Sequence, residues 1–175
     1  ETVGEAAFQL IKKAAELIDM RNHRGEHPRM GATDVCPFVP VSGVSMEECV
    51  EIARKLAERV GNELGIPGYL YESAALSVER QNLATCRKGQ YEGLAKLETP
   101  GGKPDFGPAV WNEQTQRSGA TAIGARDFLI AYNINLNTTS SRRANAIAFD
   151  IRESGRVKRE DGPGSPIVKD ANGEP

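Results

Sequence analysis

Several kinds of residue are scarce in this sequence, and each shortage excludes a class of protein. Its 175 residues contain only three cysteines, at positions 36, 49 and 86, and no C-x-x-C pair. A disulfide framework and a cysteine-based zinc site are therefore not expected. The longest apolar stretches fall far short of the ~20 residues that a membrane-spanning helix needs. The first residues are acidic and lack the basic segment of a signal peptide. The few, widely spaced cysteines make a reducing cytoplasm the expected location.

Charge of one sign is not in excess either. The sequence has 22 Lys and Arg residues against 24 Asp and Glu residues, a formal net charge of -2. This balance gives no global field that would attract nucleic acid or an anionic membrane, and no local basic run replaces it. We therefore expect neither as a partner. The hydrophobic fraction of 39% is typical of a globular protein with one ordinary domain or two small ones.

The two ends of the sequence lack features that would close a domain. The chain opens without an initiator methionine, inside a helical pattern, and it finishes in Gly- and Pro-rich, charged residues. We therefore expect it to be a segment of a longer polypeptide.

The first helical pattern covers roughly residues 3–20. Its apolar residues recur at intervals of three and four, the spacing of one face of an α-helix. We expect this face to be buried; it consists of Val3, Ala7, Leu10, Ile11, Ala14, Leu17 and Ile18.

A strand–helix–strand unit is expected next. The β-prone run over 35–41 contains two prolines, which place it at a sheet edge or leave it only partly paired. Ser45 and Glu48 form a capping box that begins the clearest helix of the chain, and Gly65 ends that helix. A short strand follows over 69–71. The expected fold class is therefore α/β, with βαβ units whose helices pack on a mixed sheet.

The second half of the chain has a less regular pattern. Residues 78–98 indicate one or two short helices broken near Gly89, and residues 99–125 are rich in turn-forming Gly and Pro. The strongest strand pattern of the sequence covers 128–136, where apolar and polar side chains alternate. An amphipathic helix is expected over 140–153, with its apolar residues facing inward.

Residues 23–27, His-Arg-Gly-Glu-His, contain both histidines of the sequence. They fit the H-x-x-E-H motif, in which two histidines bind zinc and a glutamate activates water. That motif requires a helix on which His23 and His27 share one face. Gly25 costs a helix interior about 1 kcal/mol relative to Ala, and Pro28 pushes the preceding residue out of the α region. Since no third histidine is present either, the zinc interpretation is disfavoured.

Two other interpretations fit the same residues. Both histidines could be ordinary surface residues of a loop. Alternatively, a loop shaped by Gly and Pro holds an imidazole beside cationic partners, because Arg24 and Arg29 lie close to His27 in the sequence. An imidazole exchanges protons near neutral pH, and arginines grip carboxylates bidentately. The residues alone leave both interpretations open.

The segment from Leu17 to Cys49, which includes Glu26-His-Pro-Arg-Met-Gly31, resembles the signature of the formiminotransferase domain family. Further matches occur along the chain, and the resemblance covers about residues 1–155. The matching segments are Ile66-Pro-Gly-Tyr-Leu-Tyr71, Pro104-Asp-Phe-Gly-Pro108, Gly119-Ala-Thr-Ala-Ile-Gly-Ala-Arg126 and Phe128-Leu-Ile-Ala-Tyr-Asn-Ile-Asn-Leu136.

This resemblance implies a transfer of the formimino group from N-formimino-L-glutamate to N5 of tetrahydrofolate, in histidine degradation. Tetrahydrofolate would be a co-substrate, and no metal is implied. The family has two similar α/β subdomains with folate held between them, and it suggests a homodimer. Residues 1–125 would then form the N-terminal subdomain without its first strands, 126–155 would begin the C-terminal subdomain, and 156–175 would be linker or disordered.

The resemblance also carries site residues. It assigns the catalytic acid/base to His27 and not to His23. The folate-binding loop of the family corresponds to about Gly107 to Gly119, including Pro108. This chain departs from the family pattern there, since the loop is longer and Ser118 stands where a tryptophan is expected.

Other residues have a functional and an ordinary interpretation. Arg29 and Arg24 are candidate clamps for the glutamyl carboxylates, or solvated loop residues. Asp34 could orient an imidazolium or bind a pterin edge, or simply form a turn before a strand. The two tyrosines of 69–71 are expected in the core or at an interface. The small residues of 119–124 could let a ligand approach closely, although they lack the Lys-Ser/Thr ending of a nucleotide-binding loop.

The chemistry of the implied reaction suits a histidine. An amidine carbon is a poor electrophile until its nitrogen is protonated, and the glutamate amine leaves badly as an anion. One group that titrates near neutral pH could take the N5 proton and deliver it to the departing amine. His27 fits this shuttle. Three alternative functions stay open: formyl transfer between glutamate and tetrahydrofolate, a catalytically silent folate-binding relative, and a zinc hydrolase.

Overall fold

The structure is a computed structural model that describes residues 2–25, 27–97 and 102–151. The chain divides into two compact units, Glu1–Leu129 and Ile130–Pro175, which are treated separately below. The linker expected over 156–175 lies outside the described residues.

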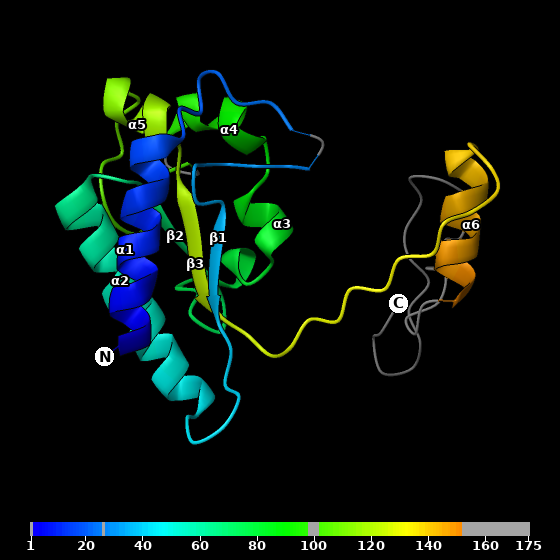
Figure 1. The fold of residues 1–175 in the computed structure, drawn as a ribbon, viewed down its shortest axis with the longest axis horizontal. Coiled ribbons are helices and arrows are strands. Elements are labelled where there is room, and N and C mark those ends of the chain that lie inside the picture. Colours follow the sequence, from blue (N-terminus) through cyan, green and yellow to red (C-terminus); the bar gives the residue numbers. More distant parts are fainter. Residues whose placement is uncertain (1, 26, 98–101, 152–175) are drawn as a thin grey trace. The chain divides into compact units, whose positions relative to one another are not determined.

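A three-stranded parallel sheet forms the centre of the first unit (Figure 1). Its strands are β1 (Val35–Phe38), β2 (Gly68–Glu72) and β3 (Thr121–Ala125), in the spatial order β1-β3-β2. The expected α/β class is confirmed. The described strands are all parallel, whereas a mixed sheet was expected. β1 lies at the edge, where the proline at position 37 needs no hydrogen bond from its nitrogen.

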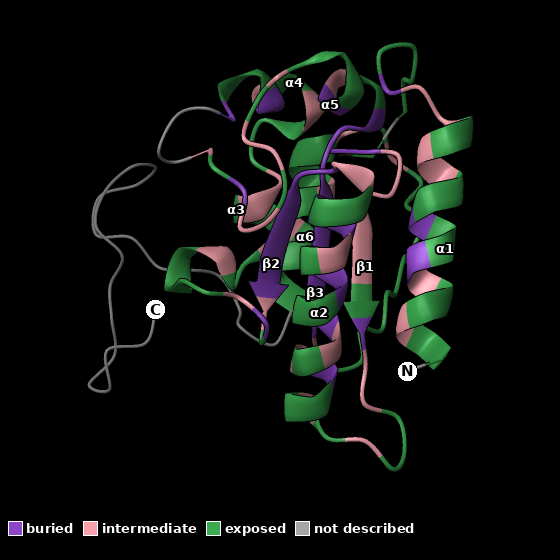
Figure 2. Cartoon of the chain, turned by 90° about the vertical axis from the view of Figure 1, so that its left-hand side faces the viewer, coloured by how far each residue is buried: buried purple, intermediate pink, exposed green. Residues whose placement is uncertain are grey.

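β3 is the central strand, although the sequence predicted only turns for this segment. Every residue of β3 is buried (Figure 2). A strand buried on both faces shows no alternation of apolar and polar residues, and three of the five residues of β3 are Ala or Gly, which are depleted in strands. The glycine in this strand has a steric reason, because a Cβ added at Gly124 would lie 2.6 Å from the Tyr71 carbonyl oxygen and 2.7 Å from the Tyr71 ring.

Two helices cover one face of the sheet. They are α1 (Thr2–Leu17) and α2 (Met46–Leu64). The capping box expected at the start of α2 is present, and Gly65 ends the helix with a left-handed φ of 61°. The buried side chains of both helices pack against Leu70 and Ile123 of the sheet. This cluster is the larger of the two hydrophobic cores.

Short helices cover the opposite face of the sheet. The segment expected to break near Gly89 does so, at a φ of 89°. A further helix, α5 (Glu113–Ser118), lies at the edge where the strands begin (Figure 1), and its Gln114 and Arg117 side chains donate to carbonyls at the ends of α2 and α1. The elements on the opposite face are the 3-10 turns η1 (Val78–Arg80) and η2 (Leu94–Lys96) and the α-helical turns α3 (Leu83–Cys86) and α4 (Gln90–Gly93). A second core cluster on this side contains Tyr69 and Tyr71, so the expectation that both tyrosines are core residues is confirmed.

The predicted buried face of α1 is only partly correct. Phe8 and Ile11 are its buried residues, while Leu10 and Leu17 are each 71% exposed. The apolar stripe of this helix is wider than its contact with α2, because a row spaced by seven residues drifts around the helix axis. Phe8 was missed because it lies outside the row that the spacing picked out.

The strand predicted over 128–136 is wrong. These residues have no regular secondary structure and are exposed, Ile130 among them at 88%. An alternating pattern makes a strand only when a neighbouring strand pairs with its N–H and C=O groups, and the described residues provide none. In the second unit, α6 (Ser141–Ile151) confirms the expected helix, but Ile147 and Ile151 are exposed instead of inward-facing.

Candidate active site

Both histidines lie in the loop that joins α1 to β1, which we call the histidine loop (residues 21–34). The described residues of this loop form no helix, as the glycine and proline predicted. The zinc motif requires both histidines on one face of a helix. His23 and His27 are exposed and do not share such a face. Within the part of the chain that the structure describes, no group of three His, Cys, Asp or Glu residues is placed to hold a metal ion.

The histidine loop lies at the edge of the sheet where the strands begin (Figure 1). Asp34 directly precedes β1, Pro67 directly precedes β2, and Ala120 directly precedes β3. Since the strands are parallel, these three residues meet at the same edge. Ligands of open parallel sheets usually bind at the opposite, carboxyl edge, so this placement follows from the loop and not from the general rule.

The loop crosses the segment before β3 at close range. Ala120 N donates to Met30 O at 3.0 Å, and Ala32 N donates to Ser118 O at 2.8 Å. An added Cβ at Gly31 would lie 2.1 Å from Ala120 O, and one at Gly119 would lie 2.2 Å from Met30 O. Gly119 also has a φ of 65°. Both glycines are therefore needed for this crossing, which the family resemblance alone did not reveal for Gly119.

Asp34 ties the loop to the short helices on the far side. Its Oδ1 accepts from Met30 N at 2.8 Å, and its Oδ2 accepts from Arg87 Nη2. The same Arg87 nitrogen donates to the carbonyl of Pro28. Asp34 thus forms the turn that was its ordinary predicted role, and its carboxylate is paired with a cation.

Arg29 makes a second tie. Its Nη1 and Nη2 donate to the two carboxylate oxygens of Glu92, at 3.1 and 2.9 Å, and Nη2 also donates to the carbonyl of His23 at 3.2 Å. The guanidinium lies 5.8 Å from the centre of the Tyr91 ring. The hydrogen bonds from Arg29 lower the pKa of Glu92. The expected carboxylate-binding fork of Arg29 is therefore occupied by a carboxylate of the protein.

Arg24 and His27 differ from Arg29 in their side-chain contacts. Both side chains are exposed, and neither has a hydrogen bond or ion pair with any other described residue. The His23 carbonyl precedes Arg24 and the Pro28 carbonyl follows His27, and each accepts a hydrogen bond from an arginine, Arg29 and Arg87 respectively. The His27 imidazole is therefore exposed, while the carbonyl of the next residue is held in place.

The predicted folate-binding residues divide into two places. Gly119 lies at the histidine loop, but Gly107 packs between α2 and the segment before β2: an added Cβ would lie 3.0 Å from Gly61 Cα and 2.6 Å from Ile66 O. Gly107 has a φ of 82°, and Pro108 beside it is half-buried. The structure brings Asp34, Arg29 and Gly119 together, and it places Gly107 and Pro108 elsewhere at the same edge of the sheet.

The segment 102–108 is held much as the histidine loop is. Phe106 O accepts from Gly68 N at 2.9 Å, and Asp105 Oδ2 accepts from Leu70 N at 2.7 Å. Arg80 Nη2 donates to Lys103 O at 2.6 Å. Arg80 Nη1 lies 2.7 Å from Asp105 Oδ2 as an ion pair, without hydrogen-bond geometry. This segment covers the free edge of β2.

Sequence reasoning missed several residues that hold the candidate site. Arg87 directly follows α3, and Tyr91 and Glu92 belong to α4. All three are far along the chain from the histidine loop, and no local pattern marks them. Tyr91 N donates to Arg29 O at 2.8 Å, its hydroxyl donates to Gln116 O at 2.6 Å, and burial raises the pKa of that hydroxyl. Its ring packs 5.4 Å from the Trp111 ring. A pairing over such separations becomes visible only in the folded chain.

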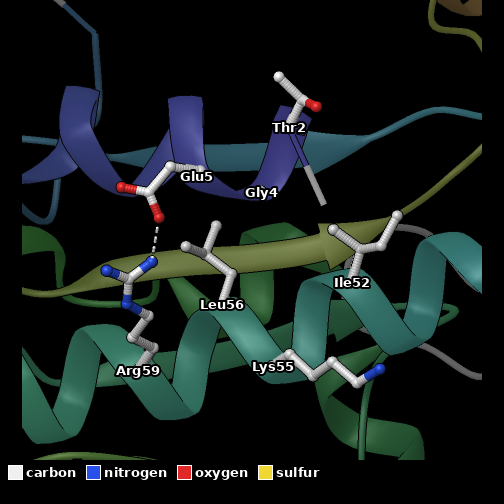
Figure 3. Close-up of a pocket in the computed structure, with 7 residues that line it drawn as sticks. All are labelled: Thr2, Gly4, Glu5, Ile52, Lys55, Leu56 and Arg59. Atoms are coloured by element: carbon white, nitrogen blue, oxygen red, sulfur yellow. Dashed lines mark hydrogen bonds and ion pairs between the residues drawn. The ribbon is translucent and has the colours of Figure 1, made fainter.

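A cavity of about 550 Å³ lies away from the histidine loop, between α1 and α2 (Figure 3). Apolar side chains of Ile52 and Leu56 line it together with Lys55 and an ion pair of Arg59 and Glu5, whose closest atoms are 2.5 Å apart. None of its lining residues belongs to the histidine loop or to the segment 102–120. It therefore has no part in the candidate site.

Comparison with known proteins gives the family. The sequence matches the N-terminal subdomain of the formiminotransferase domain over residues 1–126, and the formiminotransferase domain over residues 131–170. In the described residues no helix is both long enough and apolar enough to cross a bilayer.

Named relatives agree with this match. The chain is 53% identical to a glutamate formimidoyltransferase of Streptococcus pyogenes serotype M1, over 89% of this chain and 51% of the relative. It is 54% identical to a glutamate formimidoyltransferase of Thermoplasma acidophilum, over 85% of this chain and 48% of the relative. It is 54% identical to a formimidoyltransferase-cyclodeaminase of Gallus gallus, over 94% of this chain and 30% of the relative. The chain thus spans about half the length of the first two and less than a third of the third, and it belongs to the formiminotransferase domain family.

Proposed function

We propose that the polypeptide carrying this chain is a glutamate formimidoyltransferase, which moves the formimino group from N-formimino-L-glutamate to N5 of tetrahydrofolate. The observation that carries the proposal is the identity of 53% with a glutamate formimidoyltransferase over 89% of the chain. The geometry supports it through an exposed histidine on a loop that is braced from both sides. Tetrahydrofolate is a co-substrate in this proposal, and the reaction belongs to histidine degradation.

His27 is the proposed general acid/base. N5 of tetrahydrofolate attacks the amidine carbon and forms a C–N bond, and His27 takes the proton that N5 loses. The tetrahedral intermediate then breaks its bond to the glutamate nitrogen, which receives that proton from His27 and leaves as a neutral amine. The imidazole ends in its starting protonation state, and no covalent intermediate with the protein is needed. General acid/base catalysis of this kind contributes about 100- to 10,000-fold to a rate.

Arg24 is the better placed of the two proposed carboxylate clamps. Its guanidinium has no ion-pair partner among the described residues, and it stands three residues before His27. Arg29 would first have to release Glu92. We therefore assign the first contact with a glutamyl carboxylate to Arg24 and keep Arg29 as the second candidate.

Folate is proposed to contact the amino edge of the sheet. Gly119 and Asp34 lie at the histidine loop, while Gly107 and Pro108 lie on the neighbouring segment. Holding both substrates together could contribute several kcal/mol, since effective molarities reach about 10⁵ M or more in well-oriented pairs. A homodimer in the cytoplasm, and a division into subdomains over 1–125 and 126–155, complete the proposal.

A matched pair of variants in the polypeptide as its gene encodes it tests the function. His27→Ala should lower kcat for formimino transfer by about 100- to 10,000-fold, because the proton shuttle is lost. His23→Ala removes an imidazole from the same loop but keeps the carbonyl that Arg29 binds, so its kcat should stay within about threefold of wild type. Conversion of tetrahydrofolate with N-formimino-L-glutamate is followed by absorbance.

Each other result points to a named alternative. Equal losses in both variants would sink the assignment to His27. A wild type that transfers formyl but not formimino groups would identify the donor as N-formyl-L-glutamate. A wild type that binds tetrahydrofolate without turnover would indicate the catalytically silent relative, and stoichiometric bound zinc would return the hydrolase.

A further inference from the structure

We infer that Arg87 is a positioning residue that fixes the backbone on which His27 stands. The inference rests on the proposed function for its catalytic consequence, but the contacts that carry it are independent of any substrate. Arg87 directly follows α3, outside every motif of the family resemblance that the sequence displays. Its guanidinium donates hydrogen bonds to two acceptors of the histidine loop at once.

The first contact is with the peptide that joins Pro28 to Arg29, one residue beyond His27. Arg87 Nη2 donates to the carbonyl oxygen of Pro28, and that carbonyl belongs to the residue directly after His27. A guanidinium is a charged donor, and charge-assisted hydrogen bonds are about twice as strong as neutral ones. The orientation of the chain leaving His27 is therefore set from α3.

The second contact closes the turn behind it. The same nitrogen donates to Asp34 Oδ2, while Asp34 Oδ1 accepts from Met30 N at 2.8 Å. Arg87 thus binds both ends of the 28–34 turn, the Pro28 carbonyl at one end and the Asp34 carboxylate at the other. Removing the guanidinium frees both ends together.

The neighbouring residues add a parallel tie. Tyr91 N donates to Arg29 O at 2.8 Å, and Glu92 holds the Arg29 guanidinium, which itself binds the carbonyl of His23. The segment 87–92 therefore controls the backbone on both sides of 24–27. Within it Arg87 makes the contact nearest to His27.

Burial shows that this arginine acts on the loop and is not a free surface cation. Its side chain is 22% exposed, and its Nε has no hydrogen-bond partner in the described part of the chain. Both hydrogen bonds come from one nitrogen, Nη2, so a lysine, whose ammonium carries three donors on a flexible stem, would keep part of this contact. Arg87 touches no proposed reacting atom, so its effect on the reaction passes through His27.

The test uses Arg87→Met in the polypeptide as its gene encodes it. Misplacement of a catalytic group by about 1 Å costs on the order of 100-fold, so we expect kcat for formimino transfer to fall about 10- to 100-fold, with KM for both substrates within about threefold. In a His27→Ala background the same substitution should cause no further loss of kcat. A residue with a merely structural role would lower the activity of both backgrounds alike.

Amide hydrogen exchange supplies a readout that does not depend on activity. In Arg87→Met the Met30 amide should exchange at least about tenfold faster, because its acceptor Asp34 loses its partner. Arg80→Met is the matched control: Arg80 is 20% exposed, pairs with Asp105 and binds the Lys103 carbonyl. It should leave exchange in the histidine loop unchanged and speed exchange at Leu70 instead.

The possible results separate this inference from the proposed function. A wild type without formimino transfer overturns the proposed function, and the exchange rate of Met30 still decides whether Arg87 holds the loop. Unchanged exchange at Met30, or an equal fall in kcat in both histidine backgrounds, overturns the inference. Should Arg87→Met not fold, Arg87→Lys is measured in its place, with the same signs and a smaller fold-change expected.

Discussion

Two loops at the amino edge of the sheet are each held by an arginine–aspartate pair, but the pair has a different role in each loop. In the histidine loop Arg87 pairs with Asp34, and Asp34 accepts from Met30 N. In the 102–108 segment Arg80 pairs with Asp105, and Asp105 accepts from Leu70 N. Each arginine also binds a backbone carbonyl of the loop that it holds.

The difference lies in which backbone group the aspartate satisfies. Leu70 belongs to β2, so Asp105 completes the hydrogen bonding of a buried edge strand, and its side chain is only 11% exposed. Met30 belongs to a loop, and Asp34 is 25% exposed. The first pair therefore stabilises the sheet, while the second orders a loop that carries an accessible histidine. Similar contacts do not imply similar roles.

Each of the two loops also contains a glycine that packs closely against backbone atoms. Replacing that glycine should have the largest effect on stability. Gly31→Ala places a Cβ 2.1 Å from Ala120 O, and Gly107→Ala places one 2.6 Å from Ile66 O at a φ of 82°. We expect each to lower the free energy of unfolding by about 3 kcal/mol, the upper end for overpacking. Urea denaturation measures it. Gly43→Ala, where the added Cβ meets nothing within 4 Å, should cost only about 1 kcal/mol for its left-handed φ, and equal losses in all three would refute the steric argument.

Removing the aspartates should separate stability from activity. Asp105→Ala leaves a buried Leu70 N–H and an arginine unpaired, so we expect a loss of about 3 kcal/mol; Asp34→Ala should cost about 1 to 2 kcal/mol because the site is more exposed. The order should reverse for kcat, where Asp34→Ala has the larger effect through the histidine loop. Denaturation midpoints and kcat, measured on the same preparations, check both orders.

The same order in stability and in kcat would remove the distinction between a sheet-stabilising and a loop-ordering pair. Asp34→Asn and Asp105→Asn sharpen the test, because each keeps an oxygen that can accept from the backbone N–H and removes only the charge.

The smallest effect is expected from the loss of the Arg29–Glu92 ion pair, which belongs to the histidine loop alone of the two loops compared. Glu92→Gln removes the ion pair with Arg29, whose carboxylate partner is exposed, so we expect a loss of about 0.5 kcal/mol. The pKa of Glu92 is lowered by Arg29 below its ordinary 4.5, so the pair stabilises the fold at neutral pH and this stabilisation is lost as the pH falls below 4.5 through the lowered value. Unfolding curves of wild type and variant should differ at pH 7 and converge in acid. A difference that persists in acid would mean that Glu92 acts through packing.

Much of the fold could be predicted where a local rule acts alone. Ser45 and Glu48 cap α2 by a local hydrogen-bond pair, and Gly25 with Pro28 keeps the histidine loop out of a helix. The reverse holds for β3 and for 128–136. β3 needs a glycine at position 124 because Tyr71 lies against it, and 128–136 has the alternation of a strand without a neighbour among the described residues. Both depend on a partner that a local pattern does not contain.

The candidate site was predictable to a similar degree. The family signature marks His27, Arg29 and Asp34, which are close in sequence. Arg87 and Glu92 reach the loop only through the fold, and their charges are unremarkable in a sequence with 46 charged residues, counting 22 Lys and Arg and 24 Asp and Glu. The residues that hold the site are thus harder to find than those proposed to act in it.

The crossing of Gly31 and Gly119 has a consequence for the order in which the chain folds. The backbone of the histidine loop takes its place only when the segment before β3, near the other end of the first unit, lies against it. Contacts between residues so far apart in the chain form late, since closing a long loop costs entropy before any contact repays it. A ribosome must therefore release most of the first unit before the histidine is held in position, and a partly made chain carries no formed site.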